Sequence, residues 1–261
     1  MHTHGEMQDP GRGLRPLPRR AFALLAAEVA VLAIGWQLYR LGRYAARDQV
    51  SEAFDNADRV SSVERGLGLD VEVGIQRLAV AWDPVIEALN RYYVYTHFVV
   101  IVVALLAAFV LARPTYRRVR RVLVGATALG LVIHTLFPLA PPRLVRSSGL
   151  TDTLAVYGPR VYSADWSESI SNQFAAMPSL HVGWSVLAAW AVVSTFRSRW
   201  RWLIVVHPAV MAIAVVATGN HFMVDGIVGT ALVAAVAIAD ARVRASRPAS
   251  RGADELVVAP T

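Results

Sequence analysis

The sequence predicts an all-α polytopic membrane protein, a bundle of six transmembrane helices with amphipathic helices outside the bilayer. Hydrophobic residues make up 55% of the chain and the mean hydropathy is +0.43, values typical of membrane proteins. The net charge of +7 comes entirely from arginines that cluster at the ends of apolar runs. That pattern indicates membrane topology and argues against a nucleic-acid partner. There is no cysteine, which excludes disulfides and thiolate chemistry.

Six apolar runs are the predicted spans. The first resembles the apolar core of a signal peptide, but it is too long and has no convincing cleavage site after it. The second opens with Tyr92, Tyr93 and Tyr95, which are typical of an interfacial aromatic belt. The spans are expected at roughly 21–38, 92–111, 122–139, 179–196, 202–217 and 221–239.

The remaining segments are polar or amphipathic. Apolar residues recur at helical spacing through 42–90, including Val60, Val63 and Leu67, so we expect helices that lie along the membrane surface. Asp83-Pro84 reads as an N-cap followed by the first helical residue. Residues 140–178 form a long polar loop of the kind that often serves as a lid or binding segment. The predicted organisation is a disordered tail at 1–20, a six-helix membrane catalytic domain at 21–241 containing the 42–90 helices and the 140–178 loop, and a disordered tail at 242–261.

The arginines predict the orientation. Sixteen of the 26 lie in the two tails and in the basic turns at 113–121 and 197–201. The positive-inside bias places all four segments, and both termini, in the cytoplasm. The segments 42–90 and 140–178 and the tight turn 218–220 are then extracytoplasmic. We expect an integral protein of the cell (plasma) membrane with its active site on the outer side.

A histidine and a carboxylate stand four residues apart at the start of the last span. His221 and Asp225 fall on one face of a helix, about 6 Å apart along its axis. A neutral imidazole oriented by a carboxylate is a nucleophile or base suited to phosphoryl or acyl chemistry. A buried pair that only ties helices together is the alternative, and this stretch alone does not decide between them.

The predicted topology brings further polar residues to the same depth. Each is costly in or beside a membrane, and their convergence at one level favours a functional site over a structural one. The members are His97, His134, Arg143, His181, His221 and Asp225.

Their chemistry suits a phosphate. Arg143, held by two prolines, offers a planar fork for phosphate oxygens. Ser179 and His181 stand with backbone N–H groups at a predicted helix N-terminus, which is a natural anion site. One histidine can attack phosphorus while the other protonates the leaving oxygen. A zinc site is the rival use of such a cluster, but the arginine opposes a cation. We therefore expect no metal and no cofactor.

At these residues the sequence resembles the type 2 phosphatidic acid phosphatase superfamily. It is most similar to the branch of inositol phosphorylceramide synthase-like transferases (inositolphosphotransferases). The matching pieces include a Pro-Ser-x-His motif and a His-x-x-x-Asp motif on successive outer helix ends, and the similarity covers roughly residues 45–240. The pieces are 138–144, 174–184, 219–225 and the Tyr93…His97 spacing.

The resemblance implies a six-helix bundle with a metal-independent phosphohistidine mechanism. His221 would be the nucleophile, Asp225 its orienting partner and His181 the general acid toward the lipid leaving group. The implied substrate-binding residues are Arg143, Ser179, His97, His134, Tyr93 and Asn220, with loop arginines such as Arg146 and Arg160 as further candidates.

Three departures from the superfamily pattern accompany the resemblance. The lysine of the first motif is absent, Val215 stands where the third motif has arginine, and Leu180 replaces the usual glycine. Phosphate binding must then depend on Arg143, with help from His97, His134 or loop arginines such as Arg146 and Arg160. Such losses are expected of the transferase-like branch.

The predicted function is an enzyme that cleaves or transfers a phosphoryl or phospho-headgroup of a lipid phosphate at the outer face. The partners would be that lipid, membrane lipids, and an alcohol or sugar-lipid acceptor when water is not the acceptor. A transporter or scramblase that uses the polar cluster as a headgroup path is the alternative, although no internal repeat supports it. A structural scaffold would not need the histidines.

Overall fold

The structure is a computed structural model that describes residues 49–159 and 174–246. The predicted first span, the tail at 1–20, Arg160 and residues 247–261 lie outside the described residues. The described part is helical, apart from one isolated bridge between Leu139 and Ala175. Its elements are α2 (Val50–Leu67), α3 (Glu72–Val80), α4 (Asp83–Arg91), the π-helical η2 (Tyr92–Thr96), α5 (His97–Leu111), α6 (Arg113–Leu136), η3 (Pro142–Leu144), η4 (Arg146–Ser148), α7 (Thr153–Tyr157), α8 (Leu180–Thr195), η7 (Arg199–Val205), α9 (Val206–Ala217) and α10 (Met223–Ala245).

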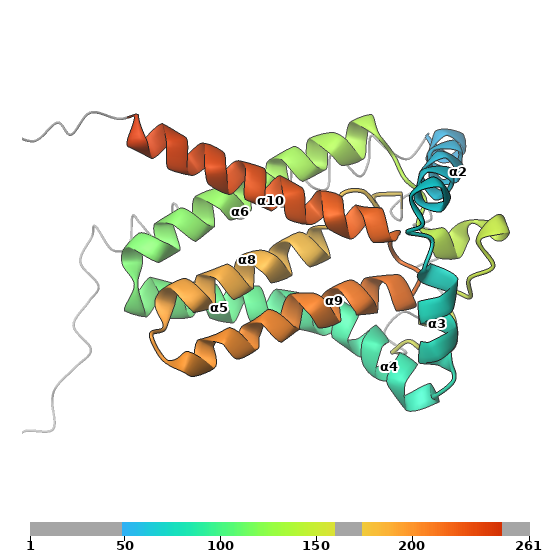
Figure 1. Ribbon diagram of the computed structural model, residues 1–261, viewed down its shortest axis with the longest axis horizontal. Coiled ribbons are helices and arrows are strands. Elements are labelled where there is room, and N and C mark those ends of the chain that lie inside the picture. The colour runs from blue at the N-terminus through green and yellow to red at the C-terminus, as the bar shows by residue number, and fades with distance from the viewer. Residues whose placement is uncertain (1–48, 160–173, 247–261) are drawn as a thin grey trace, which may run out of the picture. The chain divides into compact units, whose positions relative to one another are not determined.

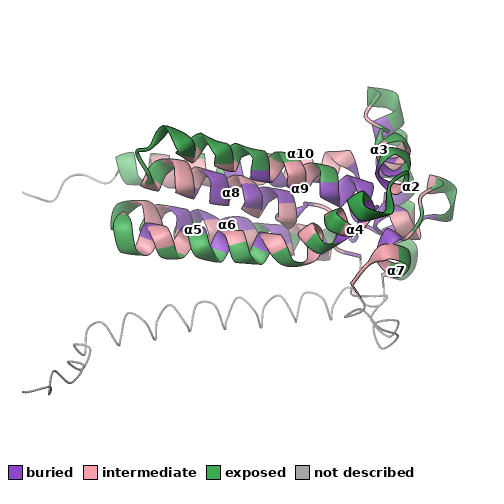
Figure 2. Cartoon of the chain, turned by 90° about the horizontal axis from the view of Figure 1, so that it is seen from below, coloured by how far each residue is buried: buried purple, intermediate pink, exposed green. Residues whose placement is uncertain are grey.

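Helix α8 is the centre of the bundle. It packs against α5, α6, α9 and α10 (Figure 1). Its buried face consists mostly of small residues, which let neighbouring helices approach closely. The small buried residues are Gly183, Ser185, Ala188, Ala189 and Ala191. Figure 2 shows the buried residues concentrated between the helices and the exposed ones on the outward faces.

The helices have the length and composition of a membrane protein. Within 49–159 and 174–246, four are long and apolar enough to cross a bilayer: Asp83–Leu111, Arg113–Leu136, Arg199–Ala217 and Met223–Ala245. The outward face of α5 is apolar, as expected of a surface that meets lipid, with Phe98, Val102 and Leu106 exposed. The all-α membrane class is therefore confirmed. The count of six spans stays a prediction, because 21–38 is not described and α8 has 16 residues.

Several predicted boundaries were wrong. The basic segment 113–121 is no turn: α6 begins at Arg113, one residue after α5 ends, because Pro114 suits a first helical turn and arginine favours helix. The segment at 197–201 runs into the 3₁₀-helix η7. Helix α4 begins at Asp83 itself, with Trp82 as the N-cap. Short helices η3, η4 and α7 occupy part of the predicted loop at 140–178.

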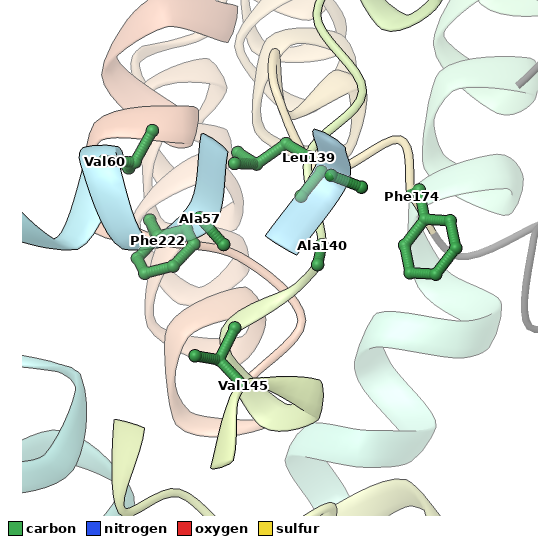
Figure 3. Packing of buried hydrophobic residues seen from close by; sticks show 9 residues of the cluster. Ala57, Val60, Leu139, Ala140, Val145, Phe174 and Phe222 are labelled. Carbon is green, nitrogen blue, oxygen red and sulfur yellow. The ribbon is translucent and has the colours of Figure 1, made fainter. Parts of the chain in front are cut away.

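The amphipathic segment forms helices, as predicted, and they gather at the end of the bundle where α10 begins. Both views place α2, α3 and α7 there, whereas the arginine-rich ends of α6, α8 and α10 lie at the opposite end (Figures 1 and 2). Helix α2 packs on the bundle through Ala53, Ala57 and Val60. Val63 and Leu67, predicted on the same buried stripe, are instead 54% and 65% exposed. Figure 3 shows the stripe against Leu139, Ala140, Val145, Phe174 and Phe222.

Candidate functional site

His221 and Asp225 form a buried pair where α10 begins. The prediction that they share a helical face was wrong, because α10 begins at Met223 and His221 lies in the turn before it. The Nδ1 atom of His221 lies 3.3 Å from Oδ2 of Asp225, and the same oxygen accepts the backbone N–H of Phe222 at 2.9 Å. Asp225 is fully buried and His221 is 5% exposed. A carboxylate that accepts from Nδ1–H fixes the imidazole tautomer and leaves Nε2 with its lone pair. The pair therefore has the geometry of an oriented nucleophile or base.

The start of α8 is attached directly to the His221–Asp225 turn. The backbone N–H of Ser179 donates to the carbonyl oxygen of Asp225 at 2.9 Å. Gly229 makes this approach feasible, because a Cβ there would lie 2.2 Å from the Ser179 carbonyl oxygen. The contact brings the rings of His181 and His221 to a centroid distance of 5.8 Å. His181 of α8 and His221 of the turn before α10 thus face one site.

Residues of the η2–α5 junction cover His181 from the side. The ring of Tyr93 stacks on His181 at 4.4 Å between centroids, and His97 lies at 4.1 Å. Nδ1 of His97 is 3.2 Å from the carbonyl oxygen of Tyr93. The π-helical turn Tyr92–Thr96 immediately precedes His97, and such turns occur often at functional sites.

His134 supports the segment that leads into α8. Its Nε2 atom is 3.2 Å from the carbonyl oxygen of Pro178, the residue before Ser179. The Ser179 hydroxyl is fully buried and acts as the N-cap of α8, accepting the backbone N–H of Val182 at 3.5 Å. Both residues therefore have a clear part in building the site. Their predicted contact with a substrate stays a prediction.

Arg143 lies over the turn that precedes His221. Its backbone N–H donates to the carbonyl oxygen of Gly219 at 2.9 Å, and its Nε donates to Oδ1 of Asn220 at 3.0 Å. Nη1 is 3.5 Å from Oδ2 of Asp152. Gly219 has a φ of 67°, and a Cβ there would meet Arg143 Cβ at 2.9 Å, so both the conformation and the space require glycine. The guanidinium is thus held beside the His221 turn.

The structure brings together Tyr93, His97, His181 and His221 through ring contacts, and it joins Arg143, Asn220, Ser179 and Asp225 to the same turn through hydrogen bonds. Arg146, a further phosphate candidate, is exposed on η4. Within 49–159 and 174–246, no group of three His, Cys, Asp or Glu side chains is placed to hold a metal ion.

Sequence reasoning missed a histidine and two glutamates near the site. His207 is buried in α9, and its Nδ1 lies 2.5 Å from the hydroxyl of Tyr92, the neighbour of Tyr93. Glu64 and Glu72 are buried against the start of α10. A signal for Glu64 was present, because it continues the helical spacing of Ala57 and Val60 into the buried face of α2.

A polytopic helical bundle with two facing histidines and an aspartate at its polar end defines a class of membrane proteins suited to phosphoryl chemistry. The PAP2 superfamily profile matches residues 58–239, which is most of the chain. The chain therefore belongs to the PAP2 superfamily, whose members are generally phosphatases and phosphotransferases. Comparisons with curated proteins and with solved structures found no match.

Proposed function

We propose that the protein is a membrane enzyme that cleaves or transfers the phosphoryl or phospho-headgroup of a lipid phosphate through a phosphohistidine. The observation that carries this proposal is the His221–Asp225 pair at 3.3 Å, with the His181 ring 5.8 Å from that of His221. Membership of the PAP2 superfamily supports the reaction class.

The proposed first step is attack by Nε2 of His221 on phosphorus. The P–O bond to the leaving group breaks, and His181 gives its proton to the departing oxygen. Asp225 stabilises the positive charge that develops on the imidazole. In the second step His181 takes a proton from water or an alcohol, whose oxygen attacks phosphorus and releases His221. Water as acceptor yields a phosphatase, and an alcohol yields a transferase.

Arg143 is the proposed anchor of the phosphate oxygens. It is an arginine attached to the His221 turn through Gly219 and Asn220, and its fork suits two phosphate oxygens. Tyr93 and His97 are proposed to line the substrate beside His181. Ser179, His134 and Asn220 complete the proposed set by shaping the surface that meets the phosphate.

The finer proposal is an inositolphosphotransferase-like transfer at the outer face of the plasma membrane. It is supported by the motif resemblance around 138–144 and by the absence of the lysine and arginine that simple phosphatases of the superfamily carry. The position of the arginine-rich helix ends opposite the His221 end supports an extracytoplasmic site through the positive-inside bias.

The test is mass spectrometry of the products that purified protein forms from candidate lipid phosphates, with and without alcohol acceptors such as inositol. The expected result is a dephosphorylated lipid or a new phosphodiester, formed equally after dialysis against strong chelators and abolished by His221→Ala. Glu87→Gln, at an exposed glutamate paired with Arg91, is the matched control and should retain full turnover. Loss of turnover on chelation, restored by zinc alone, would replace the phosphohistidine with a metal mechanism.

A transporter or scramblase is the competing function, and no specific observation in 49–159 or 174–246 favours it. If the protein were a transporter or scramblase, the His221→Ala variant and the wild type would both move labelled lipid across a proteoliposome membrane. The lipid would stay chemically unchanged. Such a result would overturn the enzymatic proposal.

A further inference from the structure

Three carboxylates from three different helices bind the first N–H groups of α10. Asp225 accepts from Phe222 at 2.9 Å, Glu72 of α3 accepts from Met223 at 2.9 Å, and Glu64 of α2 accepts from Val224 at 2.8 Å. A helix N-terminus leaves these donors without intrahelical partners, and its positive dipole end favours anions. The His221 turn is therefore fixed from outside the bundle by α2 and α3.

Glu64 and Glu72 are buried together, with side chains that hydrogen-bond to each other. Their residues are 1% and 6% exposed. Burial raises the pKa of Glu64 to about 8. The hydrogen bond from the N–H of Val224 lowers this pKa, whereas the nearby Glu72 and Asp225 raise it further. Glu64 thus keeps a proton at neutral pH, with the carboxyl groups of Glu72 and Asp225 close enough to favour that protonated form.

We propose that Glu64 and Glu72 are positioning residues that bind the first N–H groups of α10, fix its first turn and thereby keep His221 in its reactive orientation, with Glu64 acting in its protonated form. The proposal rests on the proposed function of His221 and deepens it. When Glu64 loses its proton, its negative charge stands beside the carboxyl groups of Glu72 and Asp225 at one helical turn, and the added repulsion loosens that turn. His221 is the other titratable group in direct contact with this set. Turnover then falls as the proton leaves.

The Glu64→Gln variant tests the role of the Glu64 proton, because it keeps the hydrogen bonds of that side chain but cannot ionise. Its amide oxygen still accepts the N–H of Val224, and its NH₂ group donates to Glu72 as the protonated carboxyl does, but it does not ionise. Glu64→Leu has similar bulk and removes the acceptor, which leaves a buried N–H without a partner. The glutamine variant should keep the neutral-pH rate, whereas the leucine variant should lose about tenfold or more in kcat, from a lost buried hydrogen bond.

The decisive measurement is the ratio of kcat for Glu64→Gln to kcat for wild type as a function of pH. Ionisations at other positions occur in both proteins and largely cancel in the ratio. At a pH about one unit below the pKa of Glu64, this ratio of kcat values should stay near one. At a pH one unit above that pKa, the ratio should rise to about ten, because about ten of eleven wild-type molecules have then lost the Glu64 proton. A ratio that is flat across this range would overturn the proposal.

Hydrogen exchange gives a readout that needs no substrate. At each pH, amides of 222–225 should exchange equally in wild type and Glu64→Gln below the pKa and faster in wild type above it, with Glu87→Gln as the control that follows wild type. Equal exchange throughout would refute the positioning role. A pH-dependent difference in exchange without turnover on any lipid phosphate would support the positioning role and refute the proposed function.

Discussion

Ser179 and Asp225 are joined by a backbone hydrogen bond of 2.9 Å, so α8 and α10 begin against each other. The serine of the Pro-Ser-x-His motif and the aspartate that ends the His-x-x-x-Asp motif are thereby hydrogen-bonded to each other. His181 lies two residues into one chain segment and His221 four residues before Asp225 in the other. This contact therefore helps to set the spacing of the two rings.

Gly229→Ala should damage the site without touching either histidine. The added Cβ would lie 2.2 Å from the Ser179 carbonyl oxygen, a backbone atom that cannot move aside alone. Separation of α8 from α10 should lower stability by about 1–3 kcal/mol, as overpacking does. The expected readouts are a lower Tm in detergent and a kcat reduced by about tenfold or more, one power of ten per 1.4 kcal/mol of lost transition-state stabilisation.

Gly226→Ala is the matched control for that substitution. A Cβ at Gly226 would meet only side-chain atoms of Val182, the nearest at 3.4 Å, which is ordinary packing distance. Alanine also favours helix over glycine by about 1 kcal/mol. Wild-type turnover and a Tm equal to or above that of wild type are therefore expected. Equal damage from both substitutions would show that helix glycines matter here for a reason other than the α8–α10 approach.

Asp225→Asn should keep the fold and lose activity. An amide oxygen can still accept the N–H of Phe222, but the His221 imidazole loses the negative charge beside Nδ1. The expected decrease in kcat is about two to four powers of ten, the range of general acid–base effects. Measurements of kcat and Tm on the same preparations check it. Wild-type turnover by this variant would remove Asp225 from the mechanism.

Substitutions of the two facing histidines should have different effects on turnover. His221→Ala should abolish both turnover and the covalent phosphoenzyme, whereas His181→Ala should slow turnover most for substrates with poor alkoxide leaving groups. The reason is that an acidic leaving group needs little help from a general acid. Rapid-quench trapping of phosphohistidine across a leaving-group series measures this. A phosphoenzyme that survives His221→Ala would reverse the assignment of the nucleophile.

Single cysteines test the orientation in this cysteine-free chain. Ser147→Cys and Ser198→Cys place thiols at exposed positions in η4 and before η7. The arginine distribution predicts that an impermeant thiol reagent labels intact cells at position 147 but not at 198. The opposite labelling pattern would place the His221 end of the bundle in the cytoplasm.

The sequence by itself determined the class of protein and the members of the motifs. Long apolar runs bounded by arginines are readable because every backbone polar group in a bilayer must be satisfied within a helix. The members of the His221–Asp225 pair could be recognised from their residue types and spacing. The helical face predicted for them could not, because α10 begins at Met223 and His221 lies in the turn before it. Boundaries were less readable, because arginines favour helix and let α6 start at Arg113 inside a segment predicted as a turn.

Only the tertiary structure decided which surrounding residues hold the site. Helical spacing places Glu64 on the buried face of α2, whereas Glu72 looks in sequence like a solvated charge. Nothing local predicts that the two bind N–H groups of Met223 and Val224. Gly229 likewise reads as an ordinary helix glycine until Ser179 is placed against it. These roles arise from contacts between segments far apart along the chain. Periodicity reports the face a residue occupies, whereas its partner is set by packing between helices.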